Sequence, residues 1–496
     1  MVGLPFSWAE WGDFDAIGLA EAIRGQQVPI QGVMAQTAAA VERMNPATNS
    51  VIEMFADVIE DPSRAKANTQ GPLYGVPILI KDMGSRIEGR HQEVGMAFRE
   101  SQPAEMDDPL VENFREAGCV IVGRTAVPED GMTLLTHSIK DGDVRSPFNR
   151  LHTPGGSSGG SSATVACGMT PMCSASDGAG SIRFPASWTG LIGLKTTRGL
   201  LPLPRGLDES LMSGASEGAL TKSVRDCALI YEQLAVHRYW GNSFMPPPLM
   251  PPLLEESTGA PRTLRIGYCD ATWGSELTLA PDIENALQQM IKRLSDLGHD
   301  VRLVRPQDIC DFSVMRRAFA ISEWVLPISK ELEHEAAESG VALTEANASL
   351  QLRNHIEAGG MYTIDDFFAA KGAAEGLMRH WGEFWQGRGF DVLLTPVTPV
   401  NCPTLASDYR MDSPLPFEDW YGGLMDAACF TYPANYMGLP ALSFPAGLDS
   451  AGCPMGMQFM GPWLGEPTLM HLGFQLERNF PELVAPRPAI HVSAEG

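Results

Sequence analysis

Apolar segments of strand length alternate with amphipathic helical segments along most of this chain. The strand-like segments are residues 76–80, 120–122, 264–268, 301–304 and 392–394. Apolar residues recur at helical spacing in residues 16–44, 111–117, 283–297 and 365–385. Strands that alternate with helices pair into a sheet that those helices cover. This alternation therefore predicts an α/β fold built on a largely parallel or mixed sheet.

A proline-rich stretch, residues 241–262, interrupts the alternation. Strand-like segments of similar character lie on both sides of it, which favours one large sheet over two separate ones. We therefore predict a single domain over residues 1–496, with the proline-rich stretch as a loop within that domain.

The charge balance and the cysteines limit the partners and the cellular setting. Acidic residues number 60 against 36 basic residues, which gives a net charge of −24. Because no basic excess is available to replace the counterions of a phosphate backbone, a nucleic-acid or anionic-membrane partner is disfavoured. No apolar run reaches the ~18–20 residues of a membrane span, and the acidic N-terminal segment does not resemble a signal peptide. The nine cysteines form no C-x-x-C pairs, so we expect free thiols and a cytoplasmic protein.

The most unusual stretch of the chain is rich in glycine and serine, at residues 153–162 and 176–183. A phosphate-binding P-loop is excluded because no Gly-Lys-Ser/Thr closes the loop. The Gly-x-Ser-x-Gly pattern of an α/β-hydrolase follows no convincing apolar strand at any of its matches, residues 155–159, 156–160 and 214–218. A flexible linker is a further interpretation. Against a linker, the stretch leads directly into residues 163–168, which resemble a small-residue helix.

A fourth interpretation is a serine nucleophile served by a lysine base. Gly178 and Gly180 let the backbone turn so that successive N–H groups point at one spot. Such a nest before Ser181 suits the oxyanion of a tetrahedral intermediate. Lys81 follows the apolar run 76–80, where burial would lower its pKa toward neutrality and allow it to act as a base. Taken alone, a lysine at a strand end is more often a solvated edge residue.

Three segments, in order and spacing, resemble the motifs of the amidase signature family. They are Gly75–Asp82, Gly155–Gly160 and Gly180–Ala186. Further family-like segments lie at residues 123–129, 394–399 and 435–445. The resemblance extends from about residue 15 to about residue 480, which is nearly the whole chain.

This resemblance implies a Ser-cisSer-Lys triad within the amidase signature fold. That fold is α/β, with a large mixed central β-sheet covered by helices on both faces. In the triad, Ser181 is the nucleophile that accepts the acyl group, and Lys81 is the neutral general base. Ser157 follows a cis peptide bond and passes protons between them. The signature core that carries the triad covers residues 70–200.

The resemblance also implies roles for residues around the nucleophile. The oxyanion hole consists of backbone N–H groups, those of Gly178, Ala179, Gly180 and Ser181. The supporting residues are Ser158, Asp177 and Arg183. The family sequence before the nucleophile is usually Asp-Thr-Gly-Gly-Ser, so Ala179 stands where a glycine is common. If that position requires a positive φ, the loop must be arranged differently here.

Within the family, residues 176–181 and 195–199 are similar to one branch. That branch contains 6-aminohexanoate cyclic dimer hydrolase and related nylon-oligomer and aryl-amide hydrolases, and carbamate-cleaving members look alike at this level. The expected function is hydrolysis of amide C–N bonds, with a urethane- or ester-preferring hydrolase as an alternative. A second alternative, the catalytic component of a tRNA-dependent amidotransferase, is disfavoured by the acidic balance. A catalytically inactive binding protein is disfavoured because every triad residue is present.

Substrate and cofactor contacts are less marked in the sequence. Three apolar residues in a loop, Met132, Leu134 and Leu135, are candidates for lining a substrate pocket. The ten histidines are dispersed and no H-E-x-x-H occurs, so we expect no metal and no cofactor. The expected partner is a small-molecule amide, ester or carbamate, and a monomer and a homodimer are both compatible with the sequence.

Overall fold

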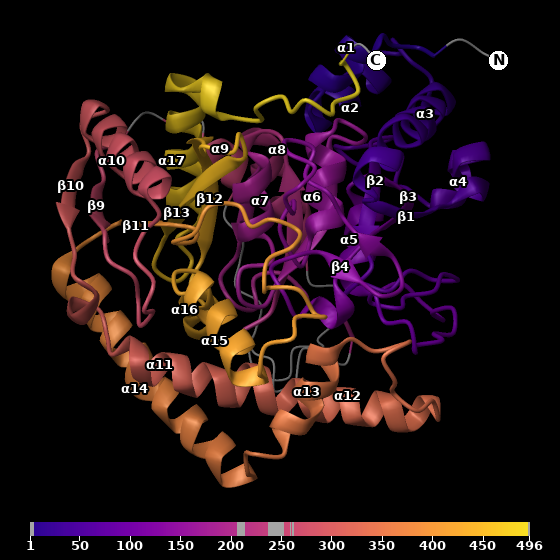
Figure 1. Cartoon of the computed structure of the whole chain (residues 1–496). Coiled ribbons are helices and arrows are strands. Elements are labelled where there is room, and N and C mark those ends of the chain that lie inside the picture. Colours follow the sequence, from indigo (N-terminus) through magenta and orange to yellow (C-terminus); the bar gives the residue numbers. More distant parts are fainter. Residues whose placement is uncertain (1–3, 206–213, 237–251, 258, 260–261, 495–496) are drawn as a thin grey trace.

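The computed structural model describes residues 4–205, 214–236, 252–257, 259 and 262–494. Within these residues the fold is built on one 11-stranded sheet with the order β1-β3-β2-β6-β8-β7-β12-β13-β11-β9-β10 (Figure 1). Its strands are β1 (Val51–Met54), β2 (Pro77–Lys81), β3 (Val120–Thr125), β6 (Met172–Asp177), β7 (Ile192–Lys195), β8 (Ser216–Thr221), β9 (Arg265–Tyr268), β10 (Asp300–Leu303), β11 (Val392–Pro396), β12 (Ala441–Leu448) and β13 (Pro454–Met460). A separate two-stranded sheet pairs β4 (His137–Ser138) with β5 (Gly142–Asp143).

The sheet is mixed, as the alternation of elements predicted. Strand β2 pairs in parallel with both β3 and β6, and β9 pairs in parallel with both β10 and β11. The strands between these two parallel groups, from β6 through β8, β7, β12 and β13 to β11, pair in antiparallel fashion. Strands from both sides of the proline-rich stretch therefore belong to one sheet.

Helices cover both faces of the sheet (Figure 1). Strand β11 shows why, because Val392 and Leu394 belong to one hydrophobic cluster and Leu393, which points the other way, belongs to a second. The first cluster includes residues of α1 (Trp8–Asp13), α2 (Ala16–Arg24), α3 (Ile30–Thr48), α4 (Ala56–Glu60), α5 (Pro109–Glu116), α6 (Gly159–Ala166), α8 (Val224–Leu234), α9 (Leu253–Ser257), α10 (Pro281–Asp296) and α17 (Glu466–Asn479). The second includes residues of α11 (Phe312–Phe319), the π-helix η4 (Ala320–Val325), α12 (Leu326–Ser339), α13 (Leu350–Gly359), α14 (Ile364–Arg388), α15 (Phe417–Ala427) and α16 (Tyr432–Met437).

Helix α7 (Arg183–Thr189) contributes to both clusters. The remaining elements are short 3₁₀ turns, η1 (Pro62–Ala65), η2 (Glu129–Gly131), η3 (Pro306–Asp308) and η5 (Pro481–Leu483). In the described part of the chain, no helix combines the length and the apolar character needed to cross a membrane.

The strand and helix segments expected from periodicity are present, with ends that differ by a few residues. The proline-rich stretch differs from expectation in one part. Residues 253–257 form α9 rather than loop, and Leu253 of this helix is fully buried. The backbone N–H of Leu254 also donates to Glu232 of α8 (2.7 Å), so packing against a neighbouring helix stabilises this short turn. The other residues of 241–262, apart from Pro252, Gly259 and Arg262, lie outside the described residues.

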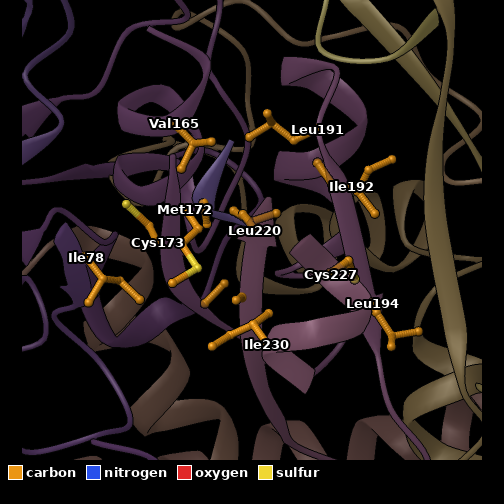
Figure 2. Packing of buried hydrophobic residues seen from close by; sticks show 14 of the residues in the cluster. Ile78, Val165, Met172, Cys173, Leu191, Ile192, Leu194, Leu220, Cys227 and Ile230 are labelled. Carbon is orange, nitrogen blue, oxygen red and sulfur yellow. The ribbon is translucent and has the colours of Figure 1, made fainter. Parts of the chain in front are cut away.

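The glycine- and serine-rich stretch is a packed part of the core, so the linker interpretation is wrong. Helix α6 begins at Gly159, and its residues are buried throughout. A Cβ at Gly160 would lie 2.7 Å from the Ser50 carbonyl oxygen, so only glycine permits this close approach. Figure 2 shows Val165 of α6 beside buried side chains from strands β2, β6 and β8. This packing fixes the position of the loop just before α6.

Candidate active site

Lys81 is the last residue of β2, and its side chain is fully buried. The strand Pro77–Lys81 is buried at every position, so the lysine amine is carried into the interior rather than to a solvated edge. Its Nζ lies 2.7 Å from Ser157 Oγ and 2.8 Å from Ser176 Oγ. The Lys81 backbone N–H donates to Ser174 Oγ (2.8 Å), which ties the end of β2 to β6.

Burial lowers the pKa of the Lys81 amine to about 7, although the negative charges of Glu217 and Asp177 act to raise it. An amine with that pKa is partly neutral at physiological pH and can accept a proton. Burial, two hydroxyl contacts and a lowered pKa distinguish Lys81 from a solvated lysine at a strand end.

Ser157 lies in the loop between Thr153 and α6, after a cis Gly156–Ser157 peptide bond, as the family resemblance implied. The preceding Gly155 has a φ of +98° and packs against the backbone of Pro185. Thr136 Oγ1 donates to the Gly155 carbonyl (2.7 Å), which anchors the loop from the other side. These contacts hold the Ser157 hydroxyl against Lys81.

Ser181 lies in the turn between the end of β6 at Asp177 and the start of α7 at Arg183. Gly180 has a φ of +137°, a conformation that side-chain-bearing residues rarely adopt. Ala179, in contrast, is not among the residues with a positive φ. The alanine at the position where the family commonly has glycine is therefore compatible with this loop.

The backbone N–H groups of the turn are not equivalent. The Gly180 N–H donates to Asp177 Oδ1 (2.7 Å), so this group is already engaged within the protein. The N–H groups of Gly178, Ala179 and Ser181 donate to no protein acceptor among the described residues. Those three groups can provide hydrogen bonds to an oxygen atom of a bound molecule.

Asp177 and Arg183 form a fully buried ion pair beneath this turn. Arg183 Nε and Nη2 donate to the two Asp177 carboxylate oxygens (2.9 and 2.8 Å), and the Ile182 N–H also donates to Asp177 (3.1 Å). Burial alone would raise the pKa of Asp177, but the Arg183 guanidinium outweighs it and lowers that pKa to about 2. Asp177 therefore remains ionised, and the pair shapes the turn. Ser158 lies behind the turn, where its hydroxyl donates to the Ser176 carbonyl (3.3 Å).

Ser181 borders two cavities. The larger cavity, of about 270 Å³, has a mixed lining, in which Ser157, Ser176 and Glu217 lie beside apolar residues such as Met83 and Ile328. The other is small and mostly apolar, and its lining includes Met132, Leu134, Phe184, Trp324 and Leu424. A molecule with its reacting atom at Ser181 can thus extend into a larger cavity that offers polar groups or into a smaller, apolar one.

Two of the three residues expected in the substrate pocket, Met132 and Leu134, line the apolar cavity. Leu135, the third, lines neither of these two cavities. Its side chain is fully buried, and its backbone packs near Gly156, where a Cβ would lie 2.9 Å from the Leu135 nitrogen. Leu135 therefore supports the Gly156–Ser157 loop instead.

Comparison with known proteins supports an assignment for this arrangement. A family model described as Amidase matches residues 33–470. The chain belongs to the amidase family. It is 31% identical over 486 residues to a 6-aminohexanoate-cyclic-dimer hydrolase of Paenarthrobacter ureafaciens, with 96% of each chain covered.

Solved structures show the same fold. The structure of a 6-aminohexanoate cyclic dimer hydrolase complexed with substrate aligns with a TM-score of 0.86 at 29% identity, covering 97% of this amidase and 99% of that chain. The crystal structure of a bacterial aryl acylamidase of the amidase signature enzymes aligns with a TM-score of 0.83 at 23% identity, covering 98% and 100% of the two chains. At that identity the second likeness concerns the fold alone.

The described part of this amidase contains one group of side chains with the composition of a metal site, His152, Cys402 and Cys453. Hydrogen bonds within the protein account for two of its members. His152 Nδ1 lies 2.8 Å from the Cys402 carbonyl, and the Cys402 thiol donates to the Thr153 carbonyl (3.1 Å). Burial raises the pKa of Cys402 well above its ordinary value, which disfavours the thiolate that a metal would require.

Two polar residues that border the larger cavity, Ser176 and Glu217, were not predicted as site residues. They are direct partners in the β6–β8 pairing, with their Cα atoms in register. Both lie inside segments that the sequence singled out for their glycines, yet nothing local connects them to Lys81. A period-two pattern across β6 and β8 could have placed them on one face of the sheet.

Removal of the Arg183 side chain from this amidase is expected to reduce stability strongly. In Arg183→Ala, Asp177 would remain buried without its counter-charge, which typically costs about 3–5 kcal/mol. Urea unfolding followed by circular dichroism measures the change in the free energy of unfolding. The matched control is Arg64→Ala, which breaks the exposed Arg64–Asp61 pair and should leave the free energy of unfolding almost unchanged, because water screens exposed pairs. Equal losses in the two variants would show that the buried pair is not a main support of the turn.

Proposed function

We propose that this amidase hydrolyses amide C–N bonds through a covalent acyl-enzyme on Ser181, with Ser157 and Lys81 as a proton relay. The observation that carries the proposal is the buried contact between Lys81 Nζ and Ser157 Oγ (2.7 Å), at the wall of a cavity that also reaches Ser181. A buried amine with a pKa near 7 is a base of suitable strength for activating a hydroxyl.

In the proposed acylation step, Ser181 Oγ attacks the substrate carbonyl carbon. The Ser181 proton passes to Ser157, while the Ser157 proton passes to Lys81. The oxygen of the tetrahedral intermediate accepts hydrogen bonds from the free N–H groups of the turn, those of Gly178, Ala179 and Ser181. When the C–N bond breaks, the relay runs in reverse and protonates the leaving amine. Water then attacks the acyl-enzyme by the same route and releases the acid.

The substrate class follows from the two cavities and from the relatives. The apolar cavity beside Met132 and Leu134 suits a hydrocarbon or aryl part of the substrate. Polar side chains in the mixed lining of the larger cavity suit a second amide or a charged end. The similar protein from Paenarthrobacter ureafaciens is named for the cyclic dimer of 6-aminohexanoate. We therefore propose linear or cyclic amides with apolar chains, and include carbamates and esters as further substrates of the same mechanism.

We also infer that the chain acts on small molecules without nucleic acid and without a membrane, as a cytoplasmic single-domain protein. Its net charge of −24 supports the absence of a tRNA partner. The same charge disfavours the alternative of a tRNA-dependent amidotransferase, which would need a partner to provide a basic surface.

A substrate panel with one shared acyl group tests this proposal. The purified chain alone should hydrolyse anilides, aliphatic amides and cyclic amides, and the matched esters should react at least as fast because they need less help with the leaving group. Product formation is followed by chromatography at pH 8 without added nucleotide, tRNA or partner. Hydrolysis of esters and carbamates with no detectable amide turnover would contradict an amidase. Activity only with an added tRNA and partner protein would favour the amidotransferase alternative.

A further inference from the structure

Glu217 lies on β8 with its Cα in register with Ser176 of β6. Ser176 Oγ lies 2.8 Å from Lys81 Nζ. The pairing of β6 with β8 therefore places Glu217 next to the residue that contacts the Lys81 amine. Glu217 is only 5% exposed, and it lines the larger cavity together with Ser157 and Ser181. A buried acidic residue is thus placed on the same wall as the proposed proton relay.

The chain makes room for this carboxyl group. Gly84, with a φ of +83°, lies against it, and a Cβ at Gly84 would overlap Glu217 Oε1. Any other residue at position 84 would push the carboxyl group away from its place. The glycine after β2 therefore serves the approach of Glu217 as well as the turn of the chain.

The charged surroundings of Glu217 single out one interaction. No ion-pair partner of Glu217 lies in direct contact among the described residues. Two charged groups shift the pKa of Glu217 through space. The Lys81 ammonium ion lowers that pKa, and the Asp108 carboxylate raises it. The negative charges that raise the pKa of Lys81 are those of Glu217 and Asp177. Asp177 already forms an ion pair with Arg183. Glu217 is the acidic group near Lys81 that the described residues leave without a bound cation.

We propose that Glu217 is the counter-charge of Lys81, a positioning residue that keeps the lysine amine directed at the serines and stabilises the ammonium ion formed during acylation. This inference rests on the proposed function. When the Ser181 proton reaches Lys81 through Ser157, the amine becomes an ammonium ion, and the Glu217 carboxylate balances that charge. When the leaving amine takes the proton, Lys81 returns to its neutral form.

The pH dependence follows from the sign of this interaction. Burial raises the pKa of Glu217 and lowers that of Lys81, while attraction between the two opposite charges works against both shifts. A nearby carboxylate makes the amine harder to deprotonate, so removing the carboxylate lowers the pKa of Lys81 further. The neutral, active amine then persists to lower pH.

The test is Glu217→Gln, which keeps the size of the side chain and removes its charge. The rate at which a fluorophosphonate probe labels Ser181 is measured from pH 5 to 10, together with kcat/KM for a p-nitroanilide. The acidic limb of both profiles should move to lower pH by about one unit. Glu217→Asp, which keeps the charge at a longer distance, should lie between the wild type and Glu217→Gln, and it serves as the test if the glutamine variant does not fold.

The matched control is Glu466→Gln on α17. Glu466 is also buried (1% exposed) and acts on a buried lysine, Lys195, but it borders neither of the two cavities at Ser181. The acidic limb of the pH profile of Glu466→Gln should coincide with that of the wild type. An unchanged limb in Glu217→Gln, or an equal shift in Glu466→Gln, would overturn the assignment. Failure of the probe to label Ser181 in the wild type would instead overturn the proposed function.

Discussion

Replacing Ser181 with alanine is expected to abolish amide hydrolysis, lowering kcat/KM by roughly 10⁴–10⁶-fold, as loss of a nucleophile does in other serine hydrolases. The reason is that no acyl-enzyme can form, so only binding and the N–H groups of the turn remain to accelerate attack by water. The measurement is kcat/KM for a p-nitroanilide, together with the intact mass of the protein after treatment with a fluorophosphonate probe.

The site of labelling gives the sharper result. In the wild type, one adduct is expected, and peptide mass spectrometry should place it on Ser181. The Ser181→Ala variant should take up no label. The control is Ser216→Ala, which removes the serine of another Gly-x-Ser-x-Gly match. Ser216 is a buried residue of β8, with its hydroxyl 3.1 Å from Thr196 Oγ1, so its loss should change kcat/KM only a few-fold. Labelling of Ser158 or Ser216 in the wild type would contradict the assignment of the nucleophile.

Replacing Lys81 with alanine should harm amide hydrolysis far more than hydrolysis of an activated ester with the same acyl group. An amide needs a proton delivered to a poor leaving amine, whereas a p-nitrophenyl ester expels its phenoxide with little help. The p-nitroanilide and p-nitrophenyl ester of one acid are compared by kcat/KM in both proteins. Each tenfold in the selectivity corresponds to ~1.4 kcal/mol of transition-state stabilisation, so a modest effect is measurable.

The pH profile of the wild type belongs to the same prediction. Lys81 acts as a base only when neutral, and burial lowers its pKa to about 7. Activity should therefore rise with pH through about 7 and be lost on the acid side as the amine takes up a proton. In Lys81→Ala this limb should disappear from the residual ester reaction.

The matched control for this experiment is Lys195→Met. Lys195 is likewise fully buried at the end of a strand, and burial lowers its pKa to about 7. Its Nζ donates to the Thr196 carbonyl (2.6 Å) and contacts no serine of the site. Its replacement should leave the ratio of amide to ester activity unchanged. Equal losses on both substrates in Lys81→Ala, with an unchanged pH profile, would mean that Lys81 has a structural role.

Much of the fold could be predicted from local patterns. The strand at 76–80 and the helix at 283–297 appear as β2 and α10 because a short apolar run and a 3.6-residue periodicity are properties of neighbouring residues. The short helix α9 was not predicted, since its stability comes from burial of Leu253 and from the contact with Glu232 rather than from periodicity. Prolines around it gave a local signal for loop that packing overrode.

The sequence by itself determined which residues are proposed to carry the chemistry, because the motifs around Lys81, Ser157 and Ser181 are specific in order and spacing. Only the tertiary structure decided what surrounds them. The contact of Lys81 with Ser176 joins residues 95 positions apart, and the place of Glu217 depends on the register of β6 and β8. The same holds for the Gly180 N–H, which is taken by Asp177, and for Leu135, which packs beneath the loop. The physical reason is that charge, burial and hydrogen-bond competition depend on distances across the sheet, and no local pattern specifies those distances.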